Sequence, residues 1–396
     1  MIATDFLVIG GGVIGISIAR ELKRKFADQT VTLLEKEAEV AQHASGRNSG
    51  VLHAGFYYTA DSLKAKFTRQ GNIAMHEYCE AKKLKMNPCG KLVVAKDERE
   101  VPVLDTLLER GRANGVPLEK ISFQDAKKIE PRVKSHRHAL WSPSTASVDP
   151  LEVTLEMKKD AAAEGVTIRT GVAYLGKRGT TLRTTAGDVQ AGYVVNSAGL
   201  YADKIALDFG FSEHYRVLPF KGVYLYSNEP AGALRTQVYP VPDLRNPFLG
   251  VHFTVTADRH IKIGPTAMPA FWREQYEGWK GFNAAEMADI VWRQAGLMLF
   301  AGFDFRRLAY EELRKYQRSH LVSLAAGLLE GVTPERYTQW GRTGIRAQLL
   351  DIRTRKLMMD FVFEKDDRSL HILNAVSPGF TCAIPFSRHI VEQIGS

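Results

Sequence analysis

The chain has 396 residues, 45% of them hydrophobic and 24% charged, a composition typical of a globular protein with room for two lobes. Its formal net charge is +9, but the basic residues are spread along the chain and form neither a tail nor a nucleic-acid-binding motif. An anionic substrate or a membrane surface is therefore favoured over nucleic acid as a partner. The three cysteines include no Cys-x-x-Cys pair, so we expect no disulfide framework and no metal site.

The N-terminal residues carry no charged stretch that leads into a cleavable apolar segment, so no signal peptide is predicted. No run of about 18 uncharged apolar residues occurs, so we expect no membrane-spanning helix. These features indicate a cytoplasmic protein, and they leave attachment to the inner face of the membrane open.

The first 35 residues predict a β-α-β unit. Residues 6–9 are a short apolar run closed by Gly10, which is typical of a strand buried on both faces. Residues 13–25 have the period of an amphipathic helix, and residues 31–34 form a second apolar strand. Such a unit opens a parallel sheet.

Beyond this unit, helical patterns alternate with short strands. The helical patterns cover residues 63–82, 101–114, 284–329 and 384–394, and the strand patterns cover residues 165–198, 217–263 and 370–373. This alternation predicts an interleaved α/β fold, in which a Rossmann-like nucleotide-binding domain alternates with an α+β lobe built on an antiparallel sheet. We assign residues 1–80, 145–212 and 338–396 to the first domain, and residues 81–144 and 213–337, with a helical insertion at 284–330, to the substrate or cap domain.

The glycine-rich turn at residues 10–15 has the spacing G-x-G-x-x-G, and Glu35 ends the second strand 20 residues after Gly15. A turn between strand and helix, followed by such an acid, is typical of a dinucleotide-binding site. Gly10 permits the tight turn, Gly12 lets the backbone approach a pyrophosphate, and Gly15 lets the helix pack on the sheet. The helix N-terminus favours phosphate, while Glu35 accepts hydrogen bonds from ribose. The same segment adds Val13, Ile14 and Lys36 to the candidate residues, and it does not separate NAD from FAD.

The chain resembles the FAD-dependent L-2-hydroxyglutarate dehydrogenases, or oxidases, of the D-amino-acid-oxidase-like flavoproteins at residues 43–58, which read HASGRNSGVLHAGFYY. Further family-like blocks follow in order at residues 61–65, 87–92, 219–222, 238–242, 248–253, 344–348 and 377–381. The family usually has Gly-His-Asn-Ser-Gly where this chain has Arg47 at the histidine position, and the match is weak over residues 290–329.

The resemblance implies FAD as the cofactor, and oxidation of L-2-hydroxyglutarate or a closely related L-2-hydroxy acid by hydride transfer from C2 to flavin N5. Val172 would contact adenine through its backbone, and the loop at residues 379–381 would approach the flavin ring ahead of a helix from about residue 384. The cofactor residues implied are Ser45, Arg47, Asn48, Ser49, Val172, Ala198, Gly199, Gly344, Gly379, Phe380 and Thr381.

Three basic residues are candidates for binding the substrate's carboxylates. A guanidinium makes a planar two-point contact, so we expect Arg346, in a Gly-x-Arg turn, to hold and orient the substrate carboxylate. Lys221 and Arg47 are candidates for the distal carboxylate of a diacid. The alternative is that Arg346 is a surface arginine without a binding role.

Oxidation of an alcohol carbon also requires a base for the hydroxyl proton. A histidine suits this role, and His53 and His252 both fall in family-like blocks, with His53 preferred because its block borders the flavin. Tyr57 and Tyr239 are candidate hydrogen-bond donors to the substrate. The alternative is that the two histidines have a structural role and that the two tyrosines are core aromatic residues.

Two other functions remain open. The first is an amino-acid or imino-acid oxidase of the same fold, which would also use FAD and an arginine that binds the substrate's carboxylate. The surplus of basic residues and the presence of His53 favour a hydroxy acid as the substrate.

The second alternative function is that of a membrane-surface flavoprotein that passes electrons to a quinone or carrier. Residues 292–303 are apolar and could form an interfacial helix. The basic residues that follow this segment are Arg306, Arg307, Arg314 and Lys315. A pair of buried core helices explains the same pattern.

Overall fold

The computed structural model describes residues 2–243, 249–300 and 305–395, with the backbone alone at Leu308. Residues 248 and 301–303, which belong to two of the segments discussed above, lie outside the described residues. The chain divides into two compact units, each interleaved along the sequence. Unit 1 comprises Met1–Asn48, Pro150–Pro219 and Ile345–Ser396, and unit 2 comprises Ser49–Asp149 and Phe220–Gly344.

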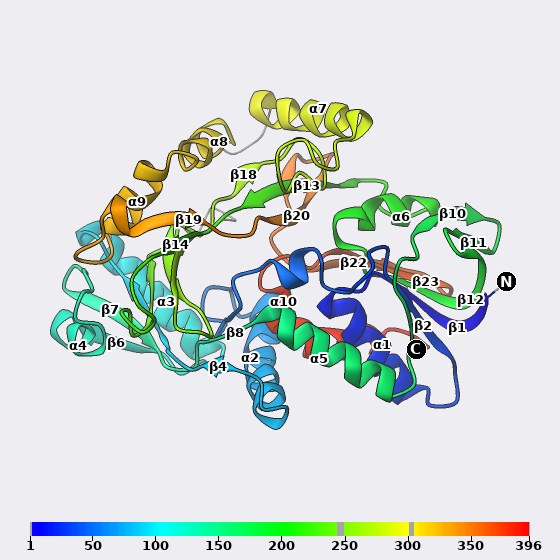
Figure 1. Cartoon of the computed structure of the whole chain (residues 1–396), viewed down its shortest axis with the longest axis horizontal. Coiled ribbons are helices and arrows are strands. Elements are labelled where there is room, and N and C mark those ends of the chain that lie inside the picture. The colour runs from blue at the N-terminus through cyan, green and yellow to red at the C-terminus, as the bar shows by residue number, and fades with distance from the viewer. Residues whose placement is uncertain (1, 244–248, 301–304, 396) are drawn as a thin grey trace. The chain divides into compact units, whose positions relative to one another are not determined.

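Unit 1 is a Rossmann-like α/β domain (Figure 1). Its helices are α1 (Val13–Lys25), α5 (Pro150–Ala163), α6 (Ala202–Asp208) and α10 (Gly379–Glu392). Its strands are β1 (Ile2–Ile9), β2 (Val31–Leu34), β9 (Thr167–Arg169), β10 (Tyr174–Arg178), β11 (Thr181–Thr184), β12 (Gly187–Asn196), β21 (Lys356–Leu357), β22 (Val362–Lys365) and β23 (Ser369–Asn374). Two further strands, β13 (Tyr215–Gly222) and β20 (Gly344–Asp351), continue from one unit into the other.

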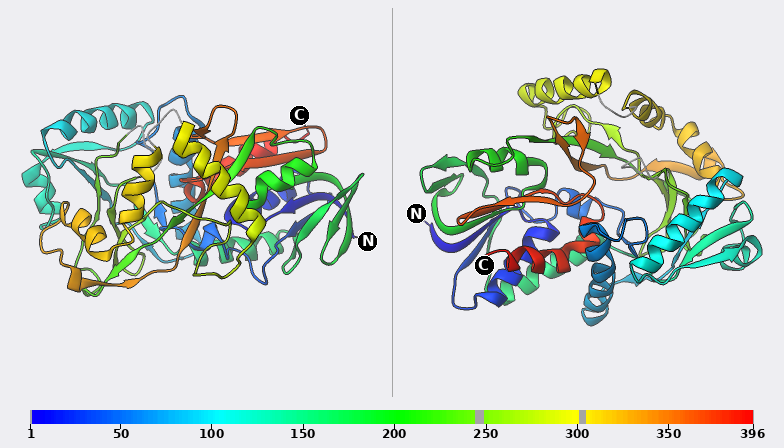
Figure 2. Two further views of the ribbon diagram at one scale, coloured as in Figure 1. Left: turned by 90° about the horizontal axis from the view of Figure 1, so that it is seen from above. Right: turned by 180° about the vertical axis from the view of Figure 1, so that it is seen from behind.

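The main sheet of unit 1 has the strand order β10-β11-β12-β1-β2-β9, with β23 paired to β12 and β22 to β23. Strand β1 is parallel to both β12 and β2, and β9 and β23 extend the parallel arrangement. Helices α1, α5 and α10 pack together on one side of the sheet, and α6 packs on the other (Figures 1 and 2). Parallel strands covered on both faces must be apolar throughout, which explains why residues 6–9 are all buried.

Unit 2 contains a second, mostly antiparallel sheet. Its helices are α2 (Leu63–Ala81), α3 (Val101–Ala113), α4 (Phe123–Ile129), α7 (Ala284–Phe300), α8 (Phe305–Arg314) and α9 (Arg318–Ala326). Its strands are β3 (Val51–Leu52), β4 (Met86–Asn87), β5 (Lys91–Val94), β6 (Glu119–Ser122), β7 (His138–Ser142), β8 (Ala146–Val148), β14 (Leu225–Ser227), β15 (Gln237–Pro240), β16 (His252–Val255), β17 (Ile261–Gly264), β18 (Met268–Pro269) and β19 (Tyr337–Trp340).

The large sheet of unit 2 has the order β19-β14-β17-β16-β15-β5-β7-β6, and only β15 and β5 pair in parallel among its described strands. Successive side chains of a strand point to opposite faces. One face of this sheet is apolar and packs against α9. Its buried members include Leu92, Val94, Leu225, Val238, Phe253, Val255, Ile261 and Ile263 from the strands and Leu321, Val322 and Ala325 from α9. The opposite face therefore receives the alternate residues of the same strands.

Several elements differ from the sequence-based expectation. Helix α10 begins at Gly379 and not near residue 384, and the expected helical stretch at 284–329 contains three helices. Helix α5 was not predicted, although Pro150 at its first position and the buried Val153 and Met157 at i, i+4 spacing are helix signals. The structural division assigns α2 to unit 2, whereas the sequence-based boundary lay at residue 80. Among the described residues, no helix combines the length and apolarity needed to cross a bilayer.

Candidate active site

The glycine turn of unit 1 lies where β1 meets α1. Gly10 has a φ of 114°, which an L side chain rarely adopts. A Cβ on Gly15 would lie 2.0 Å from the carbonyl oxygen of Gly10, so only glycine lets α1 approach the sheet this closely. The Ser45 hydroxyl lies at the same helix terminus, where it accepts a hydrogen bond of 2.9 Å from the N–H of Val13. A hydroxyl in this position can also donate to a phosphate oxygen.

Glu35 follows β2 and is held by two backbone donors. Its carboxylate accepts hydrogen bonds from the N–H groups of Gly11 (2.8 Å) and Glu37 (2.9 Å), and its side chain is buried. Each carboxylate oxygen retains capacity for a second acceptor contact, as a ribose hydroxyl would require. The N–H of Val172 donates to the carbonyl of Glu35 (2.9 Å), so only its carbonyl remains for the adenine contact expected of its backbone.

The N-terminus of α10 lies beside that of α1. A Cβ on Gly379 would be 3.7 Å from Cδ1 of Ile14, and Lys25 at the far end of α1 donates to the carbonyls of Val391 and Ile394 near the far end of α10. The two helices therefore run in parallel, with both positive ends together. Neither helix has an acidic residue in its first turn. This pair of helix ends fits a diphosphate and the electron-rich edge of a flavin.

The first turn of α10 contains Gly379, Phe380 and Thr381, so the expectation of a loop ahead of the helix was wrong. The backbone N–H groups in the first turn of a helix have no acceptor within the helix itself, so this terminus is suited to an electron-rich group. Ala198 and Gly199 follow β12, where Gly199 has a φ of 53°.

The other cofactor candidates of unit 1 mostly bind within their own loops. The Asn48 side chain donates to the carbonyls of Ala44 (3.2 Å) and Ser45 (2.8 Å), and Nε of Arg47 donates to the carbonyl of Gln42 (2.6 Å). Lys36 pairs with Glu37 (2.7 Å). Ser49 and Gly344 belong to unit 2.

The polar face of the large sheet in unit 2 is the second candidate site. Lys91 pairs with Gln237, Lys262 with Thr254, and the alternation along β15 and β16 brings Tyr239 and His252 to the same face. We call these six residues the polar strip: Lys91, Gln237, Tyr239, His252, Thr254 and Lys262. All six are buried, from 0% exposed for Lys91 to 6% for Lys262. Six buried polar side chains on one face are unusual unless they serve a ligand.

Lys91 lies in a box of aromatic rings. Its Nζ is 4.2 Å from the centre of the Tyr239 ring, 5.4 Å from that of Tyr57 and 5.7 Å from that of Phe56. Nζ and the hydroxyls of Tyr57 and Tyr239 have no hydrogen-bond partner among the described residues, and the Thr254 hydroxyl faces Tyr239 without hydrogen-bond geometry. Burial lowers the pKa of Lys91 to about 7, against a small opposing effect of Cys89.

His252 stacks on Tyr239, with 3.7 Å between ring centres and 17° between the ring planes. Its Nδ1 lies 2.8 Å from the carbonyl of Gly250, which accepts the Nδ1 proton and leaves the lone pair on Nε2. Burial lowers the pKa of His252 to about 3, with Lys91 and Lys262 adding to the effect against the Gly250 hydrogen bond. The imidazole is therefore neutral and able to accept a proton.

The other basic candidates lie on several different elements of the two units. Lys262 has its Nζ 4.5 Å from the ring centre of Tyr224, and burial lowers its pKa to about 8, against the attraction of Asp149. Lys221 is half-buried in β13, and burial lowers its pKa as well. His53 follows β3 and is half-buried. Arg346 lies within strand β20 of unit 1, so its expected position in a turn was wrong.

Comparison with known proteins agrees with this arrangement. Residues 5–393 match the model of a protein family described as "FAD dependent oxidoreductase". The chain is 35% identical to the mitochondrial L-2-hydroxyglutarate dehydrogenase of Homo sapiens, over 98% of this chain and 88% of that protein. It is 33% identical to the L-2-hydroxyglutarate dehydrogenase of Escherichia coli K12, over 98% of this chain and 93% of that protein. The chain belongs to the L-2-hydroxyglutarate dehydrogenase family of FAD-dependent oxidoreductases.

Solved structures agree on the fold of this flavoprotein. The FAD-bound L-alpha-glycerophosphate oxidase of Mycoplasma pneumoniae matches with a TM-score of 0.78 at 22% identity, over 100% of this chain and 96% of that chain. The glycine oxidase of Geobacillus kaustophilus matches with a TM-score of 0.71 at 18% identity, over 100% of this chain and 96% of that chain. FAD is the cofactor, and the paired helix ends, the close-packed Gly15 and the anchored Glu35 fit it.

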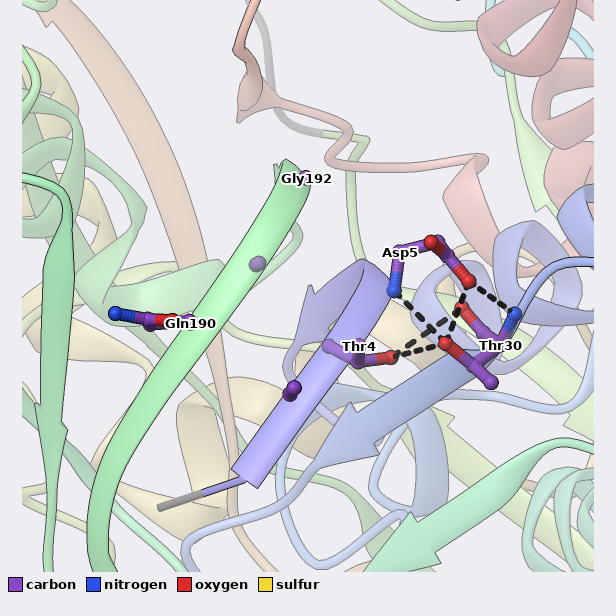
Figure 3. A pocket seen from close by; sticks show the side chains of 7 residues that line it. Thr4, Asp5, Thr30, Gln190 and Gly192 are labelled. Atoms are coloured by element: carbon purple, nitrogen blue, oxygen red, sulfur yellow. Dashed lines mark hydrogen bonds between the residues drawn. The ribbon is translucent and has the colours of Figure 1, made fainter.

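A separate pocket of about 370 Å³ lies on the sheet of unit 1 (Figure 3). Asp5 and Thr30 join there through hydrogen bonds of 2.7 and 2.8 Å, and Gln190 and Gly192 of β12 complete the wall. Asp5 precedes Gly10 by five residues of extended chain, about 16 Å. This pocket of the flavoprotein is therefore remote from the dinucleotide turn.

The sequence analysis did not single out Lys91, Lys262, Gln237 or Thr254. A signal was present, because polar and apolar residues alternate in Gln237–Pro240, His252–Val255 and Ile261–Gly264. Alternation usually indicates a solvated face, however, and nothing in the sequence shows that this face is buried.

Proposed function

We propose that the protein oxidises L-2-hydroxyglutarate to 2-oxoglutarate. The observation that carries this proposal is the polar strip, in which a neutral histidine lies between two buried lysines. A hydroxy diacid offers one hydroxyl proton to a base and two negative charges to cations, which is the chemistry this face can complement. The family relationship supports the same substrate.

FAD supplies the acceptor for the hydride that leaves C2 of the substrate. We assign removal of the hydroxyl proton to Nε2 of His252, whose ring is fixed by Gly250 and Tyr239. A dianionic substrate nearby raises the pKa of this ring, so the histidine becomes a better base when the substrate is bound. His53 is the alternative base, because it lies in the block shared with the family.

Arg346 remains our proposed partner of the carboxylate next to C2, since a guanidinium fixes both the position and the orientation of that group. Lys221 and Arg47 remain additional candidates for substrate charge. Burial favours Lys91 over both, because Lys221 is half-buried and Arg47 uses its Nε within its own loop.

The test is an anaerobic titration of the purified yellow protein with L-2-hydroxyglutarate, and with D-2-hydroxyglutarate, L-lactate and L-glutamate as comparisons. We expect the oxidised flavin band to bleach with the L-hydroxy diacid at far lower concentration than with the others. Bleaching by L-glutamate instead would establish the amino-acid oxidase alternative, and a band unchanged by L-2-hydroxyglutarate would refute the proposal.

We further propose that electrons pass to a quinone or another carrier at the inner face of the membrane. Helix α7 buries Ile290 and Leu297 and exposes Trp292 (79%) and Phe300 (63%). Arg306 and Arg307 on α8 are exposed and suit an anionic surface, whereas Lys315 is buried in an ion pair with Glu312. We expect flavin to sediment with anionic vesicles and to be released by salt, and recovery in the supernatant at low salt would refute membrane contact.

A further inference from the structure

We infer that Lys91 is the residue that recognises the distal carboxylate of the substrate, and thereby makes the enzyme prefer a hydroxy diacid over a hydroxy monoacid. This inference rests on the proposed function and assigns a specificity-determining role to a side chain inside unit 2. It depends on the burial of Lys91, on the unpartnered tyrosine hydroxyls of the surrounding aromatic box and on the closeness of Lys91 to His252.

Lys91 is a buried amino group without a counter-ion among the described residues. The side chain is fully buried, and its ammonium group makes no hydrogen bond to any residue that the structure describes. The titratable residues around it are Tyr57 and Tyr239, whose rings Nζ contacts, together with Cys89 and His252. Each of these groups is neutral at pH 7, because burial raises the pKa of the tyrosines and of the thiol and lowers that of the histidine.

A purely structural role does not explain this lysine. An apolar side chain of similar length would fill the aromatic box without the cost of burying an ammonium group that lacks partners. Contacts with aromatic faces compensate for only part of that cost. A carboxylate that enters the box would receive hydrogen bonds from Lys91 and from the hydroxyls of Tyr57 and Tyr239, and would satisfy three donors together.

Lys91 and His252 lie close enough for one substrate molecule to contact both. Tyr239 is on β15, between the strands of Lys91 and His252, and its ring centre is 3.7 Å from that of His252 and 4.2 Å from Nζ of Lys91. Nζ of Lys91 therefore lies within about 8 Å of the centre of the His252 ring. The hydroxyl carbon and the distal carboxyl carbon of L-2-hydroxyglutarate are three C–C bonds apart, about 4 Å when extended, so this diacid can present its hydroxyl to His252 and its distal carboxylate to Lys91.

The first experiment compares the wild-type holoenzyme with Lys91→Met on two substrates. L-2-hydroxyglutarate carries the distal carboxylate, and L-2-hydroxypentanoate has the same chain length without it. We expect Lys91→Met to raise KM for the diacid about 100-fold, to change kcat for the diacid little, and so to lower the preference in kcat/KM for the diacid over the monoacid about 100-fold. Retained preference for the diacid in a variant that keeps its flavin would overturn the inference.

Failure of the proposed function gives a different result, because the wild-type flavin would then not be bleached by L-2-hydroxyglutarate at all. Lys91→Arg is the second variant if Lys91→Met does not retain FAD. It keeps the charge but moves it, so we expect a smaller loss of preference for the diacid over the monoacid. An unchanged preference in Lys91→Arg would also overturn the inference.

A binding measurement gives an independent readout. Glutarate carries both carboxylates but no hydroxyl, so its binding to the holoenzyme can be followed by calorimetry at pH 8 in buffers of different ionisation enthalpy. A dianion next to Lys91 raises the pKa of its amino group, so we expect the wild-type protein to take up more protons than Lys91→Met, in which Lys262 is the remaining lysine of the polar strip. Equal proton uptake by both proteins would assign the titration to another group and contradict the inference.

Discussion

Replacement of Gly15 by alanine tests whether close packing of α1 on the sheet creates the FAD site. The new Cβ would lie 2.0 Å from the carbonyl oxygen of Gly10 and 2.6 Å from Oγ of Ser197. Normal contact requires about 3.3 Å, and the Gly10 oxygen belongs to the backbone, so α1 must move away by about 1 Å. Overpacking of this kind costs about 1–3 kcal/mol.

Because the same movement displaces the helix N-terminus from the phosphates, we expect the Kd for FAD to rise by about 10- to 100-fold. The assay is reconstitution of the apoprotein with FAD, followed by flavin fluorescence, together with the Tm of the apoprotein. The matched control is Gly296→Ala in α7, where a new Cβ meets no atom within 4 Å among the described residues. Alanine is the better helix former there, so this control should keep its FAD affinity and lose no stability. An unchanged Kd in Gly15→Ala would refute the packing argument.

Three further predictions follow from the site. His252→Asn should keep its flavin and lose at least about 100-fold in the rate of anaerobic flavin reduction, more than His53→Asn measured in parallel; the reverse order would make His53 the base. Burial lowers the pKa of His252 to about 3 and that of His371 to about 4. In the unfolded chain both histidines take up a proton near pH 6.5, whereas in the folded protein they stay neutral until the pH is much lower. The free energy of unfolding should therefore be highest above about pH 6.5 and should fall as the pH decreases toward 4. A Tm that stays constant from pH 7 to pH 4 would contradict this. Arg346→Ala should retain FAD and lose about 100-fold in kcat/KM, and loss of the flavin would assign Arg346 to the cofactor.

Local elements with one strong signal could be predicted closely. Helix α1 and strand β2 have the expected bounds, since an apolar period and a glycine turn lie within a few residues of one another. Helix α10 was placed too late because Gly379 and Pro385 both argue against a helix. Its start is stabilised by packing against Ile14 of α1, a contact between segments more than 360 residues apart in the chain.

The sequence by itself determined the cofactor turn, the interleaved order of strands and helices, and the family. Only the tertiary structure decided which polar residues share a site, because the pairing of β5 with β15 and of β15 with β16 joins segments that nothing local connects. In the sequence, Lys91 is an ordinary lysine at the start of a strand. In the folded protein, that strand pairing buries its side chain against the rings of Tyr57 and Tyr239. Desolvation, which lowers the pKa of Lys91 and turns it into a candidate ligand for a carboxylate, is a property of the folded surroundings and not of the residue.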